Sequence, residues 1–409
     1  MLYSQKNKNK NLIACIIFLL NWSWESFIMK KRLKSLDFFR GVCITWMIFG
    51  HLAEWWMSFD SFLLLNELIL FVDAIGGTGF LFISGVSLTL SYRNKIKRIK
   101  NEGDYSYKRL RLNYLLRAVF LFIVGIIYNT IDALISNNLS LIWNWFILTT
   151  LPASIILAWP LLRYKKLTKI LVAVIVLLVD HFLFLYLKPF QYQIGHPLSI
   201  VYYFLYNGYQ LTPILSHFPF FIVGSVIADI IYEKYIHQEP EIPNIKFLKK
   251  ITFPIILSGI ILILAAFLLV PFPVIVEEFL WQRRNIAWIT YAIGLLMIVY
   301  PSLFYIEKLN VIQINKKYRF FFYFSYYSFS IFLLHYSLYF LFTHGLTLNV
   351  FLPVIMITIF LIGLLLKLIY RKLGNLFSLK YQLSRLADGI TTELIKILPE
   401  LQKSDSLSI

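Results

Sequence analysis

An arginine and a histidine lie eleven positions apart in one apolar stretch of the sequence. Arg40 begins the run Arg-Gly-Val-Cys-Ile-Thr-Trp-Met-Ile-Phe-Gly, and His51 follows directly after it. Eleven helical residues rise about 16 Å and return to nearly the same helix face. A cation and an imidazole are costly to keep on an apolar membrane helix, so this pair predicts a functional site.

Asp37 lies three positions before Arg40, so the two side chains are expected to meet on one helix face. This pair has two interpretations. It can be an interfacial ion pair that anchors the helix, or the planar Arg40 guanidinium can bind a phosphate-bearing ligand while Asp37 orients it. A spacing of about 16 Å between Arg40 and His51 suits a long, thin acyl donor such as an acyl-coenzyme A.

His51 and His335 are the candidate catalytic residues. A neutral imidazole with a pKa of about 6.5 can accept a proton from a hydroxyl or amine during acyl transfer, or carry the acyl group itself. The alternative is a histidine that only hydrogen-bonds a neighbouring helix. His335 is predicted to lie at about the same depth as His51, so both imidazoles are expected to face one cavity. Because no His-Glu-x-x-His motif is present, we expect no metal.

The elements that must position these residues are membrane helices. Of the 409 residues, 59% are hydrophobic and only 15% are charged, which exceeds the apolar content of ordinary soluble domains. The sequence therefore predicts an all-α, polytopic integral membrane protein. Ten stretches are long enough to cross a bilayer: residues 38–57, 74–92, 112–131, 141–161, 167–187, 211–232, 251–270, 286–305, 320–342 and 350–370.

Basic residues gather in alternate connections between these stretches. The connections of the other set carry only Lys188, Arg283 and Arg284. Under the positive-inside rule, the basic connections and both termini are predicted to be cytoplasmic. The net charge of +18 therefore reports topology and does not indicate a nucleic-acid partner. The connection between the second and third stretches contains Arg93, Lys95, Lys97, Arg98, Lys100, Lys108, Arg109 and Arg111.

The chain is predicted to have three segments. Residues 1–28 form an N-terminal extension of undetermined role, and residues 29–373 form the membrane domain. In residues 374–409, apolar positions at helical spacing predict an amphipathic helix on the inner leaflet, followed by disorder from residue 404.

Residues 58–72 are predicted to form a short amphipathic element on the outer surface. The glycines at 76, 77, 79 and 85 indicate close helix packing or a wall for a ligand tail.

From Arg32 onward, the sequence resembles the prokaryotic membrane proteins related to the heparan-alpha-glucosaminide N-acetyltransferase catalytic domain. The resemblance rests on three matches: Arg-Leu-Lys-Ser-Leu-Asp-Phe-Phe-Arg-Gly at residues 32–41, His51, and Phe-Leu-Phe-Ile-Ser-Gly-Val-Ser-Leu at residues 80–88. The spacing of Arg40 and His51 is also similar to that of the broader membrane acyltransferase-3 group. The resemblance implies an enzyme that takes an acetyl group from cytoplasmic acetyl-coenzyme A (acetyl-CoA).

The resemblance carries over position by position to Arg40 and His51, and Asp73 matches an acidic residue before the second span of the lysosomal branch. Together with the residues discussed above, Arg40 and Asp37 are expected to bind the donor, His51 and His335 to act in catalysis, and the acidic residues Glu54 and Asp73 to bind the acceptor. In the lysosomal branch of the family, the catalytic histidine follows the first span, whereas residues 52–72 of this chain contain no histidine. The expected acceptor is a glycan, a glycolipid or another cell-surface molecule, reached from the outer side of the plasma membrane.

The competing interpretation is a transporter or lipid flippase without catalysis. Arg40 and His51 would then bind a substrate or relay protons within the bilayer. The sequence shows neither an inverted repeat nor a pair of interrupted helices, so the acyltransferase interpretation is preferred.

Overall fold

The computed structural model describes residues 33–69, 71–102, 106–193, 195–206, 212–236, 245–269, 285–309 and 319–397. Over these ranges the chain is helical, and nine helical segments are long and apolar enough to cross a membrane. The predicted all-α membrane class is therefore confirmed. From Ser35 onward the described helices belong to one compact unit, Ser35–Ile409.

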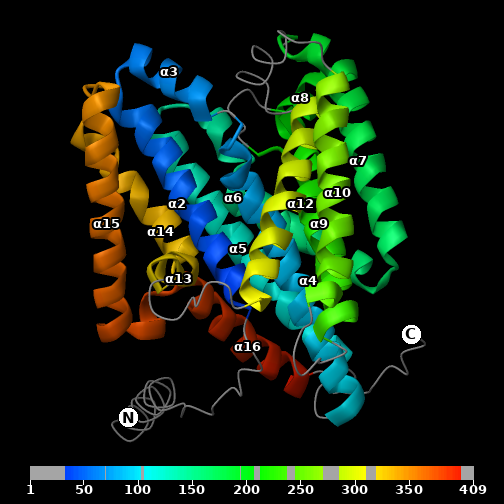
Figure 1. The fold of residues 1–409 in the computed structure, drawn as a ribbon. Helices are drawn as coiled ribbons and strands as arrows, with labels where there is room; N and C mark the ends of the chain where they lie inside the picture. Colours follow the sequence, from blue (N-terminus) through cyan, green and yellow to red (C-terminus); the bar gives the residue numbers. More distant parts are fainter. Residues whose placement is uncertain are drawn as a thin grey trace, which may run out of the picture. The chain divides into compact units, whose positions relative to one another are not determined.

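Figure 1 shows the arrangement of the helices in this unit. The longer helices are α2 (Lys34–Trp56), α3 (Phe59–Ile69), α4 (Gly77–Glu102), α5 (Tyr107–Ile135), α6 (Ile147–Ala158), α7 (Lys166–Leu187), α8 (Pro197–Tyr206), α9 (Ile214–Ile231), α10 (Ile245–Leu269), α12 (Ile286–Lys308), α13 (Arg319–Tyr326), α14 (Ser328–Leu334), α15 (Leu348–Lys372) and α16 (Leu379–Ile397). Short turns are η1 (Asp73–Ile75), η2 (Leu139–Trp143), η3 (Pro160–Arg163), η4 (Lys188–Phe190), η5 (Tyr232–Ile236), η6 (His335–Leu341) and η7 (Gly374–Phe377).

The helices α4 and α9 pack closely because glycines face the opposite backbone. A Cβ atom added at Gly85 would lie 2.0 Å from the carbonyl oxygen of Phe221, and one added at Gly224 would lie 2.1 Å from that of Phe82. Small residues permit such close contact where lipid gives helices no hydrophobic reason to associate. The packing interpretation of the glycine cluster therefore holds at Gly85.

The prediction of one continuous span over residues 320–342 was wrong. This segment consists of α13, α14 and the 3₁₀ turn η6, with an interruption at Tyr327, where φ is −101° and ψ is 21°. Tertiary hydrogen bonds hold the interruption: the Tyr326 carbonyl accepts one from Ser378 Oγ at 3.4 Å, and the Tyr327 hydroxyl donates one to Gly374 at 2.6 Å. An apolar run in the sequence cannot reveal bonds that come from another part of the chain.

Two smaller predictions can be compared with the described residues. Helix α3 occupies the connection at 58–72, and α16 is the predicted amphipathic helix of the tail. The extension at 1–28, the last residues 404–409, and Arg283 and Arg284 lie outside the described residues. The cytoplasmic location of the termini stays a prediction.

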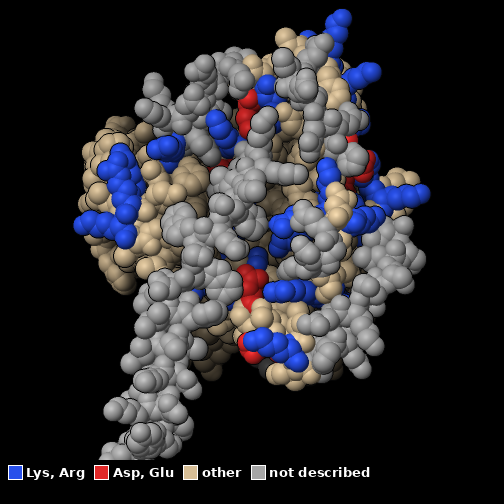
Figure 2. Space-filling view, turned by 90° about the horizontal axis from the view of Figure 1, so that it is seen from below, with Lys and Arg blue, Asp and Glu red and all other residues tan. Residues whose placement is uncertain are grey.

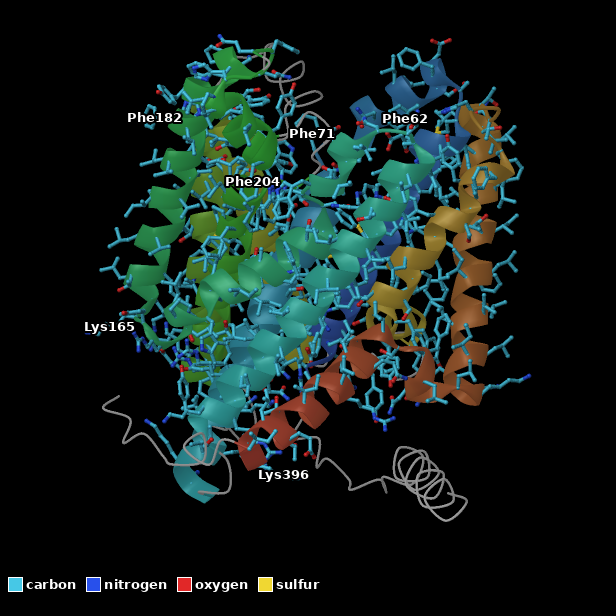
Figure 3. All side chains as sticks on the ribbon, turned by 180° about the vertical axis from the view of Figure 1, so that it is seen from behind. Phe62, Phe71, Lys165, Phe182, Phe204 and Lys396 are labelled. Atoms are coloured by element: carbon cyan, nitrogen blue, oxygen red, sulfur yellow. The ribbon has the colours of Figure 1, made fainter. Side chains whose placement is uncertain are left out.

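One end of the molecule carries many lysine and arginine side chains, as the view from below shows (Figure 2). The labelled Lys165 and Lys396 lie toward this end, whereas Phe62 and Phe71 lie toward the opposite end (Figure 3). On the side of the bundle, Phe182 points outward from α7 and is 65% exposed, as expected for a lipid-facing residue. Under the positive-inside rule, the basic end is the predicted cytoplasmic end.

A buried ion triad joins α4, α7 and α9. Lys169 Nζ lies 2.6 Å from Asp229 Oδ2, and Arg93 Nε lies 2.8 Å from Asp229 Oδ1. Lys169 also donates to Ser225 Oγ at 2.8 Å, and both Lys169 and Asp229 are buried. The sequence interpretation counted Arg93 only as a marker of topology, but in the structure it also ties α4 to α9.

We expect Gly85→Ala to lower the free energy of unfolding by about 1–3 kcal/mol, because the added methyl group overlaps the backbone of α9. Thermal unfolding of the detergent-purified protein measures this change. Gly50→Ala is the matched control, since nothing lies within 4 Å of a Cβ atom added there. An unchanged unfolding temperature for Gly85→Ala would contradict the close approach of α4 and α9.

We expect Asp229→Ala to destabilise the protein by about 3–5 kcal/mol, because the buried Lys169 ammonium loses its counter-ion. Glu233→Ala is the control: it removes the partner of Lys166 in an exposed ion pair and should change stability by about 1 kcal/mol or less. The unfolding temperatures of both variants give the comparison. Similar effects of the two substitutions would show that the triad contributes no more than a surface pair.

Candidate active site

Helix α2 carries the first two candidate residues on one continuous element. Arg40 lies in its second turn and His51 lies one and a half turns before its end. The predicted separation of about 16 Å along the helix axis therefore holds. Because the basic end of the molecule contains the start of α2, Arg40 lies near that end and His51 lies toward the opposite end (Figure 1).

Arg40 and Asp37 form a buried polar group at the start of α2. Arg40 Nη1 lies 3.8 Å from Asp37 Oδ1, and Arg40 Nη2 donates a hydrogen bond to Ser87 of α4. Asp37 Oδ1 also accepts a hydrogen bond from Ser325 Oγ of α13 at 3.3 Å. Arg40 is only 6% exposed and Asp37 is fully buried. The pair is thus held between three helices, which fixes the plane of the guanidinium.

The far end of α2 is tied to the segment that follows α14. Trp56 Nε1 donates to the Leu338 carbonyl at 2.8 Å. The backbone N–H of Ser58 donates to Leu346, and that of Leu346 donates to Trp56, each at 2.8 Å. These bonds bring together parts of the chain that are far apart in the sequence. As a result, the ring centroids of His51 and His335 lie 5.3 Å apart.

His335 has a defined hydrogen-bonding state. Its Nδ1 atom lies 2.5 Å from the Phe332 carbonyl oxygen, which can only accept, so Nδ1 carries the proton of the neutral ring. Nε2 is buried, and among the described residues it has no hydrogen-bond partner. The residue as a whole is 2% exposed. An imidazole in this state presents a lone pair that can accept a proton.

His51 differs from His335 because it faces a carboxylate. Its Nδ1 atom lies 4.0 Å from Glu54 Oε2, one turn further along α2, and the Glu54 side chain is 61% exposed. The contact joins the imidazole to a carboxylate on the same face of α2. Asp73 lies in a separate element, as the first residue of η1 before α4, and is partly buried. The structure thus groups His51, His335 and Glu54, while Arg40 and Asp37 lie at the other end of α2.

Aromatic side chains surround the two histidines, and the sequence interpretation missed them. The Trp55 ring lies 5.4 Å from His51 and 5.6 Å from His335, with planes tilted by only 18° and 16°. Tyr336 lies 4.5 Å from His335, and Tyr128 of α5 lies 5.2 Å from Tyr336. We call these five residues the histidine cluster. Trp55 is four positions after His51 and therefore shares its helix face, a signal that the sequence offers, whereas nothing in the spacing of Tyr336 and Tyr128 indicates their place.

This arrangement can perform base-assisted group transfer. Two imidazoles lie within contact distance of each other, and an aromatic wall limits the access of water to them. At the other end of α2, a fixed guanidinium offers a fork that matches phosphate geometry. The two ends suit a donor that enters from the basic end and an acceptor that reaches the histidine cluster from the opposite end.

Comparison with known proteins places these residues in a family. The family described as heparan-alpha-glucosaminide N-acetyltransferase, catalytic, matches residues 32–263. No curated protein matches the chain. The matched region contains Arg40, Asp37, His51, Glu54 and Asp73, whereas His335 lies beyond it. Since the match covers more than half of this helical membrane protein, the chain belongs to the heparan-alpha-glucosaminide N-acetyltransferase catalytic family of membrane acetyltransferases.

Proposed function

We propose that this protein transfers an acetyl group from cytoplasmic acetyl-CoA to a glycan, a glycolipid or another acceptor on the outer side of the plasma membrane. The observation that carries the proposal is the contact between His51 and His335, whose ring centroids lie 5.3 Å apart. His51 lies on α2, and the buried Arg40 and Asp37 lie near the start of the same helix. Family membership supports the acetyl group, and the geometry of α2 supports transfer between two sides of a membrane.

The donor fits the start of α2. Acetyl-CoA supplies a thioester at one end and phosphates at the other. Arg40 presents the planar guanidinium that recognises phosphate, and Asp37 and Ser87 hold its plane on two sides. The rise of about 16 Å from Arg40 to His51 lets one extended molecule reach both residues. No metal enters this proposal.

The proton transfer requires one of the two histidines. One imidazole accepts the proton of the acceptor hydroxyl or amine as the new acyl bond forms, and it returns that proton to the sulfur of the departing thiolate. His51 lies 4.0 Å from the Glu54 carboxylate, which can orient its imidazole during this transfer. The neutral His335 presents Nε2 to the same reaction space. Either imidazole can instead carry the acetyl group between the two substrates, which is the alternative route.

The acceptor fits the outer end of α2. Trp55 and Tyr336 offer ring faces against which an apolar sugar face can pack. Glu54 and Asp73 offer carboxylates that accept hydrogen bonds from hydroxyl groups or pair with an amine. A glycan or glycolipid head group carries both kinds of surface. These four side chains are the proposed acceptor contacts.

A second candidate function is transport without chemistry. The interruption at Tyr327 between α13 and α14 favours it, because transporters often build substrate sites from discontinuous helices. A transporter moves an intact substrate and leaves the thioester unconsumed, whereas the enzyme releases a free thiol. Thiol release therefore separates the two functions.

We expect purified protein in detergent to release thiol from acetyl-CoA only when a cell-surface glycan extract is present. His51→Ala and His335→Ala should each reduce this rate by about 10²- to 10⁴-fold, the usual contribution of a general base. His181→Ala, which removes an imidazole from α7, is the control and should retain the rate. Full activity of both cluster variants, with normal membrane insertion, would refute the assignment. No thiol release with any acyl donor or extract would favour transport.

We expect Arg40→Lys to raise the KM for acetyl-CoA by about tenfold with a smaller change in kcat, because an ammonium cannot replace the planar fork. Steady-state thiol release at varied donor concentration measures both constants. S-acetylpantetheine is the matched donor control, since it has the thioester without the phosphates and should not distinguish the variant from wild type. An unchanged KM for acetyl-CoA would support the interpretation of Arg40 as a helix anchor.

A further inference from the structure

The short helix that carries His335 into the histidine cluster is held by the turn between α15 and α16. Ser330 Oγ of α14 donates to the Phe377 carbonyl at 2.7 Å and accepts from Leu379 N at 3.0 Å. At the start of α14, the Tyr327 hydroxyl donates to the Gly374 carbonyl at 2.6 Å. Two side chains that precede His335, those of Tyr327 and Ser330, are therefore hydrogen-bonded to η7 and to the first residue of α16.

Helix α16 is also hydrogen-bonded to α5, the helix that contributes Tyr128 to the histidine cluster. Asp388 accepts hydrogen bonds from Asn113 and, at 3.2 Å, from Arg117, both on α5. Figures 1 and 3 show α16 running beneath the bundle from the foot of α15 toward α4 and α5. The same α5 carries Tyr128, which contacts Tyr336. Helix α16 is thus hydrogen-bonded both to α14, which leads into His335, and to α5, whose Tyr128 contacts Tyr336.

Helix α14 packs through Phe329 on Phe80 and through Phe332 on Phe146, and the bonds from Ser330 and Tyr327 add directional contacts to this packing. These bonds matter because α14 is short. It has only seven residues, is separated from α13 at Tyr327, and continues as a 3₁₀ turn from His335. Ser330 lies five residues before His335, so a shift of α14 at Ser330 moves the imidazole by a similar amount. A displacement of about 1 Å at a reacting group can reduce a rate about 100-fold.

We propose that Ser330 and Tyr327 are positioning residues that hold His335 beside His51 through the turn η7 and helix α16. The inference rests on the proposed function, in which His335 acts in acyl transfer. Neither residue touches the substrates; each acts through the position of α14. The alternative is that these bonds stabilise the fold as a whole and have no particular effect on His335.

The test uses Tyr327→Phe and Ser330→Ala in the full-length protein. Tyr327→Phe removes one hydroxyl and keeps the ring, which packs between Tyr326 and Phe377. The control is Tyr323→Phe, which removes a hydroxyl one turn earlier from a ring that also packs on Tyr370. We expect kcat to fall about 10- to 100-fold in both test variants with KM for donor and acceptor nearly unchanged. Tyr323→Phe should retain the wild-type kcat.

A second readout does not require activity. Diethyl pyrocarbonate modifies exposed imidazoles, and mass spectrometry gives the rate at each histidine. We expect modification of His335 to accelerate about tenfold in both variants relative to His217, which is also buried but lies in α9. Acceleration at both histidines together would indicate general destabilisation and overturn the proposal. Unchanged kcat and unchanged His335 modification in a folded variant would also overturn it.

The outcomes separate this inference from the proposed function. If His335→Ala retains full activity, the role of His335 in catalysis fails, while the modification rates still decide whether Ser330 and Tyr327 hold its position. If His335→Ala abolishes activity but Tyr327→Phe and Ser330→Ala retain wild-type kcat and protection, the positioning proposal alone fails. Tyr327→Phe keeps the buried ring, so it gives a folded test even if Ser330→Ala does not fold.

Discussion

The bonds between the end of α2 and the segment after α14 determine the rest of the site. Trp56 Nε1 reaches the Leu338 carbonyl, and the backbones of Trp56 and Leu346 pair beyond it. Without this contact, His51 and His335 would belong to separate membrane helices with no reason to meet. With it, two imidazoles, one indole and two phenols form the histidine cluster. The bonds are directional and short, so they specify a position that hydrophobic packing alone would leave loose.

The bilayer imposes a second constraint, because lipid offers no partner to a buried polar group. The structure meets this constraint by grouping charges between helices. Arg40 and Asp37 are enclosed by α2, α4 and α13, and Lys169 and Arg93 share Asp229 between α4, α7 and α9. Both groups lie toward the basic end of the molecule. Several buried side-chain atoms still have no hydrogen-bond partner among the described residues, and His335 Nε2 is one of them. Such an atom needs an explanation, and a catalytic role is one that fits its place beside His51.

The two ends of α2 therefore have different chemical characters. One end offers a fixed cation held by neighbouring helices, and the other offers proton acceptors behind an aromatic wall. An enzyme that takes its donor from one side of a membrane and meets its acceptor on the other requires this separation. The family match agrees with such an enzyme, and it includes the proposed site residues except His335 and Tyr336. The interruption at Tyr327 gives His335 its own short helix, whose position depends on α16.

The sequence by itself determined the helical membrane class, the continuous helix from Arg40 to His51 and the contact of Arg40 with Asp37. These features depend on local hydrophobicity and on helical spacing, both of which are legible along the chain. Only the tertiary structure decided the interruption at Tyr327, the hydrogen-bonding state of His335, the places of Trp55 and Tyr128, and the union of Lys169 with Asp229. The interruption, the aromatic contacts and the ion pair depend on residues tens to hundreds of positions away, and the hydrogen-bonding state of His335 depends on how the chain turns after Phe332. Such contacts leave no local pattern, because lipid accepts an apolar helix equally well in many packings.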